Sequence, residues 1–343
     1  MKEKTFAQAP GGRDNNLNLM RLIAALMVIF SHAFPLTGSG DDYITQLSGG
    51  QTSIGNLGIT VFFFCGGFLM MKSMEGKKTA RAYFRARCER IFPALWIVVA
   101  ACAFLLGPAV TRLPLRSYLT AGGTWKYLLN GLLIPVHPLP GVFEGNPFPE
   151  ATVNGSLWTL PVEFLCYVLC WIFYKAGFAR RDRRTLISIP LVFAAAAGAM
   201  YLLRDNELIA SAIQPVVLFF LGMQAWLWKD RLPNSPVLFA GSLALLAVSL
   251  WFRFFTWGQY FCVPMILMTL AFGLPPKAAG FGRKREISYG IYLAAWPVQQ
   301  TLCQLIPGIS QLANFALAAV LCVPLAIGIT MLENRIVSAI HHQ

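Results

Sequence analysis

The chain has 343 residues, of which 56% are hydrophobic and only 13% are charged. Soluble domains have roughly a quarter of their residues charged, so this composition excludes an ordinary soluble protein and indicates a membrane protein. The net charge of +13 comes from short basic clusters between apolar runs, which is typical of topology signals and argues against nucleic-acid binding.

The eight cysteines are spread along the chain without a CxxC motif. All but Cys88 lie in apolar runs, which argues against a disulfide framework and a zinc site. Cys166 and Cys170 share a helix face, but such cysteines usually act as small buried hydrophobic side chains. We therefore expect no bound metal.

The apolar runs predict an all-α fold, a polytopic membrane protein with about ten transmembrane helices, since each crossing needs roughly 20 mostly apolar residues. The first run also resembles a signal peptide, but Arg21 and His32 interrupt it and it is long for that role. The predicted spans are 17–36, 54–72, 91–110, 157–174, 185–203, 208–228, 236–252, 257–274, 287–306 and 312–332.

The basic residues predict the orientation of the chain. With the N-terminus in the cytoplasm, the first cytoplasmic connection is densely basic, with Lys72, Lys77, Lys78, Arg81, Arg85, Arg87 and Arg90. The opposite side has only Arg112, Arg116, Lys126, Arg204 and Arg253. By the positive-inside rule, both termini are cytoplasmic. We expect a cytoplasmic segment at 1–16, a transmembrane domain at 17–334 and a cytoplasmic tail at 335–343, in a bacterial inner membrane and surrounded by its lipids.

Residues 111–156 form a long connection on the outer side. Its apolar part, YLLNGLLIPV, is too short to cross the bilayer, so it is expected to be re-entrant or to lie at the interface. Long ordered loops often carry function.

Arg21 and His32 are ionisable residues inside the first predicted span. Their eleven-residue spacing places them on one helix face, about 16 Å apart along the axis. Taken singly, Arg21 is explained by a side chain that reaches the inner headgroups, and His32 by a hydrogen bond between helices. Together they favour a polar channel through the protein.

Arg85, Arg87 and Arg90 precede the third span, within YFRARCERIFPALW. Positive-inside anchoring alone explains their charge. The spacing of Arg87 and Arg90 additionally puts two guanidinium groups on one side of a helical turn, which suits bidentate binding of phosphate. A phosphorylated cytoplasmic ligand is therefore predicted.

Glu163 lies in the fourth predicted span, at a depth similar to that of His32, after the motif NGSLWTLPVEF. A buried Glu requires a partner, and a carboxylate beside an imidazole makes that His a better general base. Glu163 pairing with a loop residue such as Arg112 is the alternative. Ser156 is expected to cap this span, and Asn154, Ser156 and Trp158 are candidate substrate contacts.

These features together resemble the acyltransferase-3 family of integral membrane O-acyltransferases. The resemblance runs from about residue 15 to the end of the chain, through motifs in the same order. They are Arg21-x10-His32, GITVFFFCGGFLM at 58–70, Arg87-x-x-Arg90 with IFPALW, GSLWTLPVEF, and ISYGIYLAAWPVQQ at 287–300.

The resemblance implies transfer of an acyl group, commonly acetyl, from cytoplasmic acyl-CoA to a hydroxyl of an extracytoplasmic glycan or lipid-linked sugar, with no permanently bound cofactor. It implies that His32 is the catalytic histidine, with Arg21 as its channel partner, and that Arg87 and Arg90 contact the CoA phosphates, with Arg85 beside them. The outer loop is expected to shape the choice of acceptor through His137, Glu144, Glu150 and Asn154.

Two departures from the family pattern are visible. Relatives often have Ser where this chain has Gly66, so a hydroxyl role there is in doubt. Many relatives also carry a periplasmic hydrolase-like domain, and this chain is expected to be a stand-alone member.

Two other functions fit parts of the pattern. A transporter or flippase for a phosphorylated or lipid-linked sugar would explain the spans and their charges, but we find no inverted repeat and no matched pair of broken helices. A purely structural membrane subunit would leave Arg21, His32 and Glu163 unexplained.

Overall fold

The computed structural model describes residues 5–6, 15–74, 79–180, 182–203, 205–274 and 286–341. Regular structure in these ranges is helical, apart from isolated β-bridges at Thr5–Pro233 and Pro138–Thr152. Most of the predicted N-terminal segment 1–16, and the basic residues Lys77, Lys78 and Arg204, lie outside the described ranges. The predicted all-α fold is confirmed.

Each predicted span corresponds to a helix, and the chain is a multi-pass integral membrane protein. Among the described residues, eight helices are long and apolar enough to cross a membrane. The exact prediction of ten spans is not confirmed, because α11 has only 16 residues and α13 carries Gln299, Gln300 and Gln304. The helices are α1 Leu17–Leu36, α3 Ile54–Met74, α4 Ala80–Ala101, α8 Thr159–Lys175, α9 Arg183–Leu202, α10 Glu207–Trp228, α11 Pro236–Trp251, α12 Phe255–Met268, α13 Ser288–Leu305 and α14 Gln311–His341.

The chain divides into two compact units. The first unit contains Met1–Ala24, Ile44–Phe84 and Val162–Arg283, and the second contains Ala25–Tyr43, Arg85–Pro161 and Lys284–Gln343. Helices α1, α4 and α8 each contribute residues to both units. Helix α14 continues to His341, so the predicted start of the tail at residue 335 falls inside a helix. The cytoplasmic location of the two termini stays a prediction.

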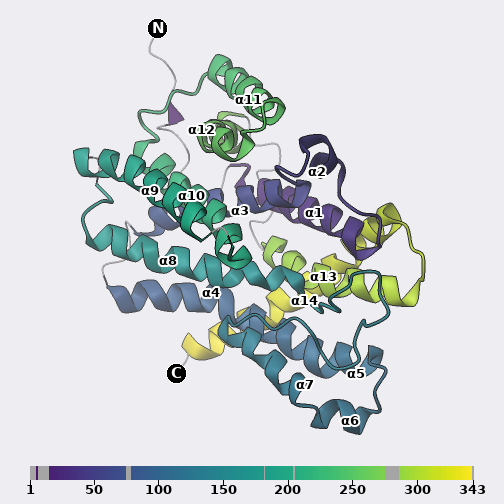
Figure 1. The fold of residues 1–343 in the computed structure, drawn as a ribbon. Helices are drawn as coiled ribbons and strands as arrows, with labels where there is room; N and C mark the ends of the chain where they lie inside the picture. The colour runs from purple at the N-terminus through teal and green to yellow at the C-terminus, as the bar shows by residue number, and fades with distance from the viewer. Residues whose placement is uncertain are drawn as a thin grey trace. The chain divides into compact units, whose positions relative to one another are not determined.

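In the first unit, α3 and α10 pack closely through glycines. A Cβ on Gly67 would lie 1.9 Å from the carbonyl oxygen of Phe219, and one on Gly222 would lie 2.1 Å from that of Phe64. Small residues let membrane helices approach until their backbones touch. Gly66 occupies the position where relatives often have Ser. A Cβ on Gly66 would lie 3.6 Å from the Phe219 ring, which is ordinary contact. In the same unit α9 lies beside α10, and α11 beside α12 (Figure 1).

In the second unit, α13 is held by amide side chains. The Nε2 of Gln299 donates to the carbonyl of Ile29 on α1 at 2.8 Å and to Oδ1 of Asn314 on α14 at 3.0 Å. Asn314 in turn donates to the carbonyl of Gln299 at 3.0 Å. Polar side chains buried in a membrane protein commonly join helices in this way. This amide clasp fixes the C-terminal half of α1 against α13 and α14.

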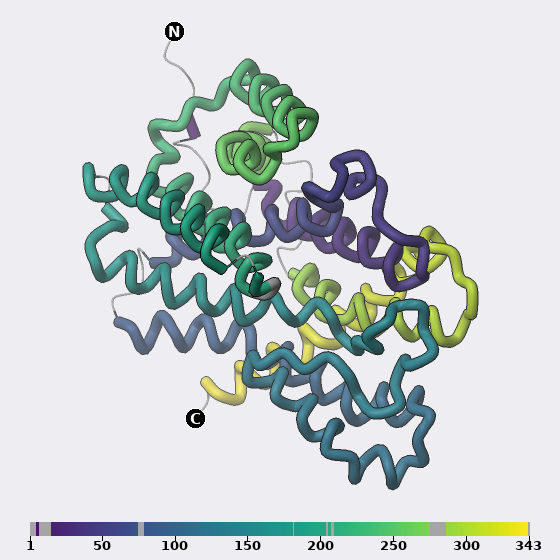
Figure 2. Tube along the Cα trace, viewed as in Figure 1, coloured from purple at the N-terminus to yellow at the C-terminus, as the bar shows by residue number. Residues whose placement is uncertain are grey.

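The outer segment 111–156 is built from short helices, whose path Figure 2 traces. After α4 come a π-helix at Cys102–Leu106, α5 at Gly107–Val110, α6 at Leu115–Thr120, α7 at Gly122–Lys126 and 3₁₀ turns at Tyr127–Leu132 and Gly155–Trp158. YLLNGLLIPV therefore forms one short turn and an extended stretch.

A buried tyrosine fastens this segment to the helix before it. The hydroxyl of Tyr118 donates to the carbonyl of Ala103 at 2.7 Å, in the space that a side chain at Gly107 would fill. Burial raises the pKa of the Tyr118 phenol, so it stays neutral and keeps this donor.

Candidate active site

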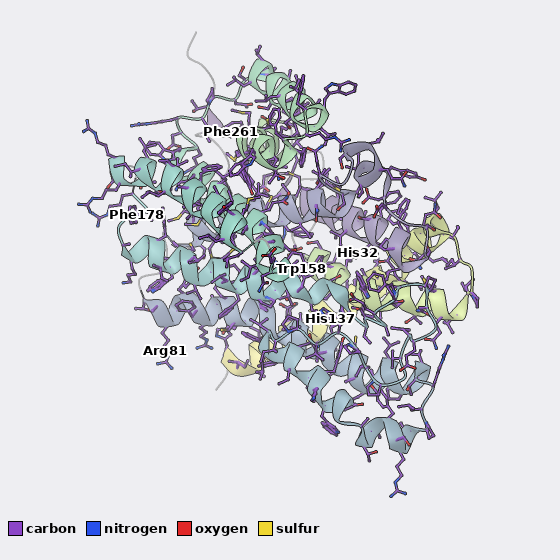
Figure 3. The ribbon with its side chains drawn as sticks, in the orientation of Figure 1. His32, Arg81, His137, Trp158, Phe178 and Phe261 are labelled. Carbon is purple, nitrogen blue, oxygen red and sulfur yellow. The ribbon has the colours of Figure 1, made fainter. Side chains whose placement is uncertain are left out.

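His32 lies in the last turns of α1, within the second unit, and Figure 3 labels it together with His137 and Trp158. Its ring meets the indole of Trp296 edge-on, with centroids 4.7 Å apart and planes at 71°. The Nδ1 atom is buried and has no hydrogen-bond partner in the described part of the chain. Buried polar atoms in native structures are nearly always paired, so this nitrogen is a candidate contact for a substrate group.

Trp296 is the residue that holds this imidazole. Its Nε1 donates to the carbonyl of Thr152 at 2.9 Å, and the ring of Phe148 meets it edge-on at 5.3 Å. A Cβ on Gly155 would come within 2.8 Å of the indole, so only glycine fits at this position without displacing Trp296. The outer segment therefore presses Trp296 against His32.

Sequence reasoning missed Trp296 and Gly155 as site residues. Both lie in quoted motifs, ISYGIYLAAWPVQQ and GSLWTLPVEF, so the motifs themselves were the available signal. A large aromatic beside an intramembrane His, and a glycine at the start of a turn, have no distinguishing charge or period.

Asn154, Ser156 and Trp158 lie at the turn that precedes α8. Asn154, rather than Ser156, is the capping residue: its Oδ1 accepts from the N–H of Ser156 at 3.2 Å, and its Nδ2 donates to the carbonyl of Leu293 at 2.9 Å. The expected cap at Ser156 was therefore wrong, because the helix is preceded by a 3₁₀ turn that begins one residue earlier.

The other polar groups of this turn differ in whether they have hydrogen-bond partners. The carbonyl of Ser156 accepts from the Tyr292 hydroxyl at 3.0 Å, whereas its Oγ is buried without a partner among the described residues. Trp158 is half-buried at the end of the turn (Figure 3). Contact of these residues with an acceptor stays a prediction.

Two of the three predicted anion-binding arginines are engaged with carboxylates. Arg90 donates to Glu286 at 2.9 Å and lies 5.6 Å from the centre of the Tyr289 ring. Arg85 pairs with Glu89 at 2.7 Å. Arg87 lies one turn before Arg90 on α4, with its Nε buried. Phosphate binding by Arg85 or Arg90 would therefore exchange one anion for another.

The other two predicted residues, Arg21 and Glu163, belong to the first unit. The Arg21 guanidinium lies 5.8 Å from the centre of the Phe62 ring. Glu163 accepts a hydrogen bond from the Tyr167 hydroxyl, one turn further along α8. Because His32 belongs to the second unit, a contact between it and Glu163 stays a prediction.

The family model described as an acyltransferase domain matches residues 14–332. The chain belongs to the acyltransferase-3 family. It is 25% identical over 297 residues to an O-acetyl transferase of Shigella phage Sf6, which covers 84% of this chain and 86% of the relative. It is 28% identical over 331 residues to Nodulation protein 10 of Rhizobium leguminosarum bv. viciae, covering 85% and 84%.

Acyltransferase MdmB of Streptomyces mycarofaciens is 26% identical over 160 residues, or 47% of this chain and 39% of the relative. No solved structure matches the chain. Family membership and these relatives show that the protein is an enzyme that transfers acyl groups other than aminoacyl groups. The resemblance stated from the motifs is thereby confirmed.

In the second unit, the arrangement that suits acyl transfer is the His32 imidazole, which can act as a general base. An imidazole whose ring nitrogen has no hydrogen-bond partner among the described residues can accept a proton from an attacking hydroxyl. The Oγ of Ser156, the residue after Gly155, is a further buried hydrogen-bonding atom without a partner in the described ranges.

Proposed function

We propose that this acyltransferase moves an acyl group, specifically acetyl, from cytoplasmic acyl-CoA to a hydroxyl of an extracytoplasmic glycan or lipid-linked sugar, in a bacterial inner membrane. The observation that carries the proposal is the buried, unpartnered Nδ1 of His32 within the described part of an apolar helix. The relative named O-acetyl transferase supports acetyl as the group and oxygen as the acceptor atom.

In the proposed mechanism His32 is the general base. It takes the proton from the acceptor hydroxyl while that oxygen attacks the thioester carbonyl, the carbon–sulfur bond breaks, and the CoA thiolate leaves and receives the proton. Trp296 keeps the imidazole in place through its ring contact. Arg21 and Glu163 are proposed to complete the polar path and to make His32 more basic.

The donor is proposed to enter from the basic cytoplasmic side. Arg87 and Arg90, with Arg85 beside them, would bind the CoA phosphates, because guanidinium groups bind phosphate through paired, charge-assisted hydrogen bonds. Arg90 would exchange the Glu286 carboxylate for phosphate as the donor arrives.

The test compares His32→Gln with Gln311→Leu in purified protein reconstituted in liposomes. Gln311 is the first residue of α14, in the same unit as His32, and is the control because it belongs to no part of the proposed site. Release of label from radiolabelled acetyl-CoA to a mixed glycan acceptor should fall by roughly 10²–10⁴-fold in His32→Gln and stay at wild-type level in Gln311→Leu. Undiminished transfer by a correctly inserted His32→Gln protein would show that His32 is not the general base.

The transporter alternative has no observation in its favour beyond the spans themselves. Family membership shows an enzyme, and a transporter would not consume acyl-CoA. The same assay separates the two functions, because it measures consumption of the donor directly.

A further inference from the structure

A polar cavity of about 280 Å³ lies in the second unit, outside the contacts already described around His32. We call it the outer pocket. Its polar lining comes from the end of α1, the outer segment and the end of α13, and its apolar walls come from prolines and Ile309. The residues used below are Thr37, Arg112, Glu144, Pro147, Gln304 and Ile309.

The outer pocket lies along the same two helices that carry His32 and Trp296. Thr37 follows His32 by five residues, or about 8 Å of helix, and Gln304 follows Trp296 by eight residues, or about 12 Å. Asn146 of the pocket donates to the carbonyl of Gln300, one turn beyond Trp296, at 2.8 Å. A ligand in the outer pocket would therefore lie about the length of one or two sugar rings from the His32 imidazole.

One residue of the pocket lining, Gln304, carries a buried acceptor that has no partner among the described residues. Gln304 donates from Nε2 to the carbonyl of Val110 at 2.9 Å, which fixes the amide, and its Oε1 is buried without a partner in the described ranges. A buried acceptor in this state is costly unless a ligand supplies a donor. A hydroxyl group is a donor that fits a neutral amide oxygen.

Charges of both signs line the pocket. The guanidinium of Arg112 packs against Gly145, where a Cβ would lie 2.1 Å from Nη2, and supplies donors. Glu144 accepts from the N–H of Gly141 at 3.2 Å through Oε1 and supplies a further acceptor. The Glu144 carboxylate would repel an anionic ligand, and the Arg112 guanidinium would repel a cationic one. A neutral ligand with both donors and acceptors therefore fits best.

We propose that the outer pocket binds a neutral sugar ring of the acceptor. Ring hydroxyls would donate to Gln304 and Glu144 and accept from Arg112, while the apolar faces of the ring lie against Pro147 and Ile309. The volume is at the small end of ligand pockets, which hold roughly 300–1,000 Å³, so it suits one sugar ring rather than CoA. Its role as acceptor site rests on the proposed function.

The test is saturation-transfer NMR on the full protein in detergent micelles, with methyl glycosides of glucose, galactose and mannose as probes. Methyl glucuronide and methyl glucosaminide serve as charged counterparts. We expect at least one neutral glycoside to receive saturation, at least fivefold more strongly than the charged sugars. Gln304→Leu and Arg112→Gln should each reduce that signal at least fivefold.

The controls are matched by residue type. Arg116→Gln and Gln311→Leu alter an arginine and a glutamine of the same unit that do not line the pocket, and both should bind as wild type does. Absence of binding by every neutral glycoside, or equal losses in the pocket and control variants, would overturn the inference.

The failure of this inference is distinguishable from failure of the proposed function. Sugar binding by a wild-type protein that transfers no acetyl group from acetyl-CoA would support the pocket and reject the proposed function. Acetyl transfer whose acceptor KM is unchanged in Gln304→Leu and Arg112→Gln would keep the function and reject the pocket.

Discussion

The imidazole of His32 lies edge-on against the indole of Trp296, with ring centroids 4.7 Å apart, although the two residues are near opposite ends of the chain. Such aromatic pairs contribute roughly 0.5–1.5 kcal/mol beyond the area they bury. That energy is enough to select one orientation of a histidine ring that has no hydrogen-bonded partner on Nδ1 among the described residues. Trp296 is therefore a positioning residue for the proposed base.

Trp296→Phe should lower kcat for acyl transfer about tenfold and leave the KM for acyl-CoA unchanged. The substitution removes the hydrogen bond to Thr152, worth about 0.5–1.5 kcal/mol, and each 1.4 kcal/mol of barrier is a factor of ten. Trp96→Phe is the matched control, since Trp96 also donates to a loop carbonyl, that of Gly131 at 2.9 Å. Equal kcat in the two variants would contradict the positioning role.

Gly155→Ala should impair transfer while the protein still inserts. The new Cβ would lie 2.8 Å from the Trp296 indole, which must shift and carry its contact with His32 along. Gly122→Ala, at a helical glycine with open space around it, is the control and should keep wild-type kcat. Steady-state transfer with radiolabelled acetyl-CoA gives the comparison, and wild-type activity of Gly155→Ala would show that the Trp296 contact is not needed.

Arg90→Gln should raise the KM for acyl-CoA several-fold, and Glu286→Gln should not raise it. Both changes break the same ion pair, which is partly exposed and contributes at most about 1 kcal/mol to stability. Only the arginine is expected to bind CoA phosphate. The two substitutions therefore distinguish binding of the donor by Arg90 from its structural ion pair with Glu286. Similar KM values for both variants, measured from CoA release at varied donor concentration, would assign Arg90 to structure alone.

Gly222→Ala should destabilise the first unit by about 1–3 kcal/mol, because its Cβ would overlap the carbonyl oxygen of Phe64 at 2.1 Å and push α3 from α10. Gly198→Ala, on α9 with open space around it, should be neutral or stabilising by up to about 1 kcal/mol. Thermal unfolding in detergent micelles measures both. A Gly222→Ala protein as stable as Gly198→Ala would show that α3 and α10 tolerate a wider separation.

Much of the fold was predictable because apolar length alone determines where a chain crosses a bilayer. All the predicted spans coincide with helices. Counting the π-helices and α5 that continue α4 and α12, the ends agree within a few residues, except where α4 begins earlier and α14 ends later. Hydropathy is a weaker guide to α13, a helix whose glutamines donate hydrogen bonds from Nε2 to other helices and to the outer segment. Such polar helices are stabilised by neighbours that a single window of sequence does not contain.

The site was predictable as a set of residues and not as a set of contacts. His32 stands out because an ionisable group is costly in an apolar run, and Arg90 stands out because of its spacing from Arg87. Their partners Trp296 and Glu286 are distant in sequence, and no local pattern records which helices become neighbours. The cap at Asn154 shows the limit at short range as well, since Asn and Ser two residues apart are equally good capping residues.

The amide clasp has a consequence for how the enzyme is made. His32 is synthesised with α1, but Gln299 and Asn314, which fix the C-terminal half of that helix, are synthesised only with α13 and α14. Until then the proposed base is present without the tryptophan that orients it. A nascent chain is therefore expected to transfer no acyl group before α13 has been made.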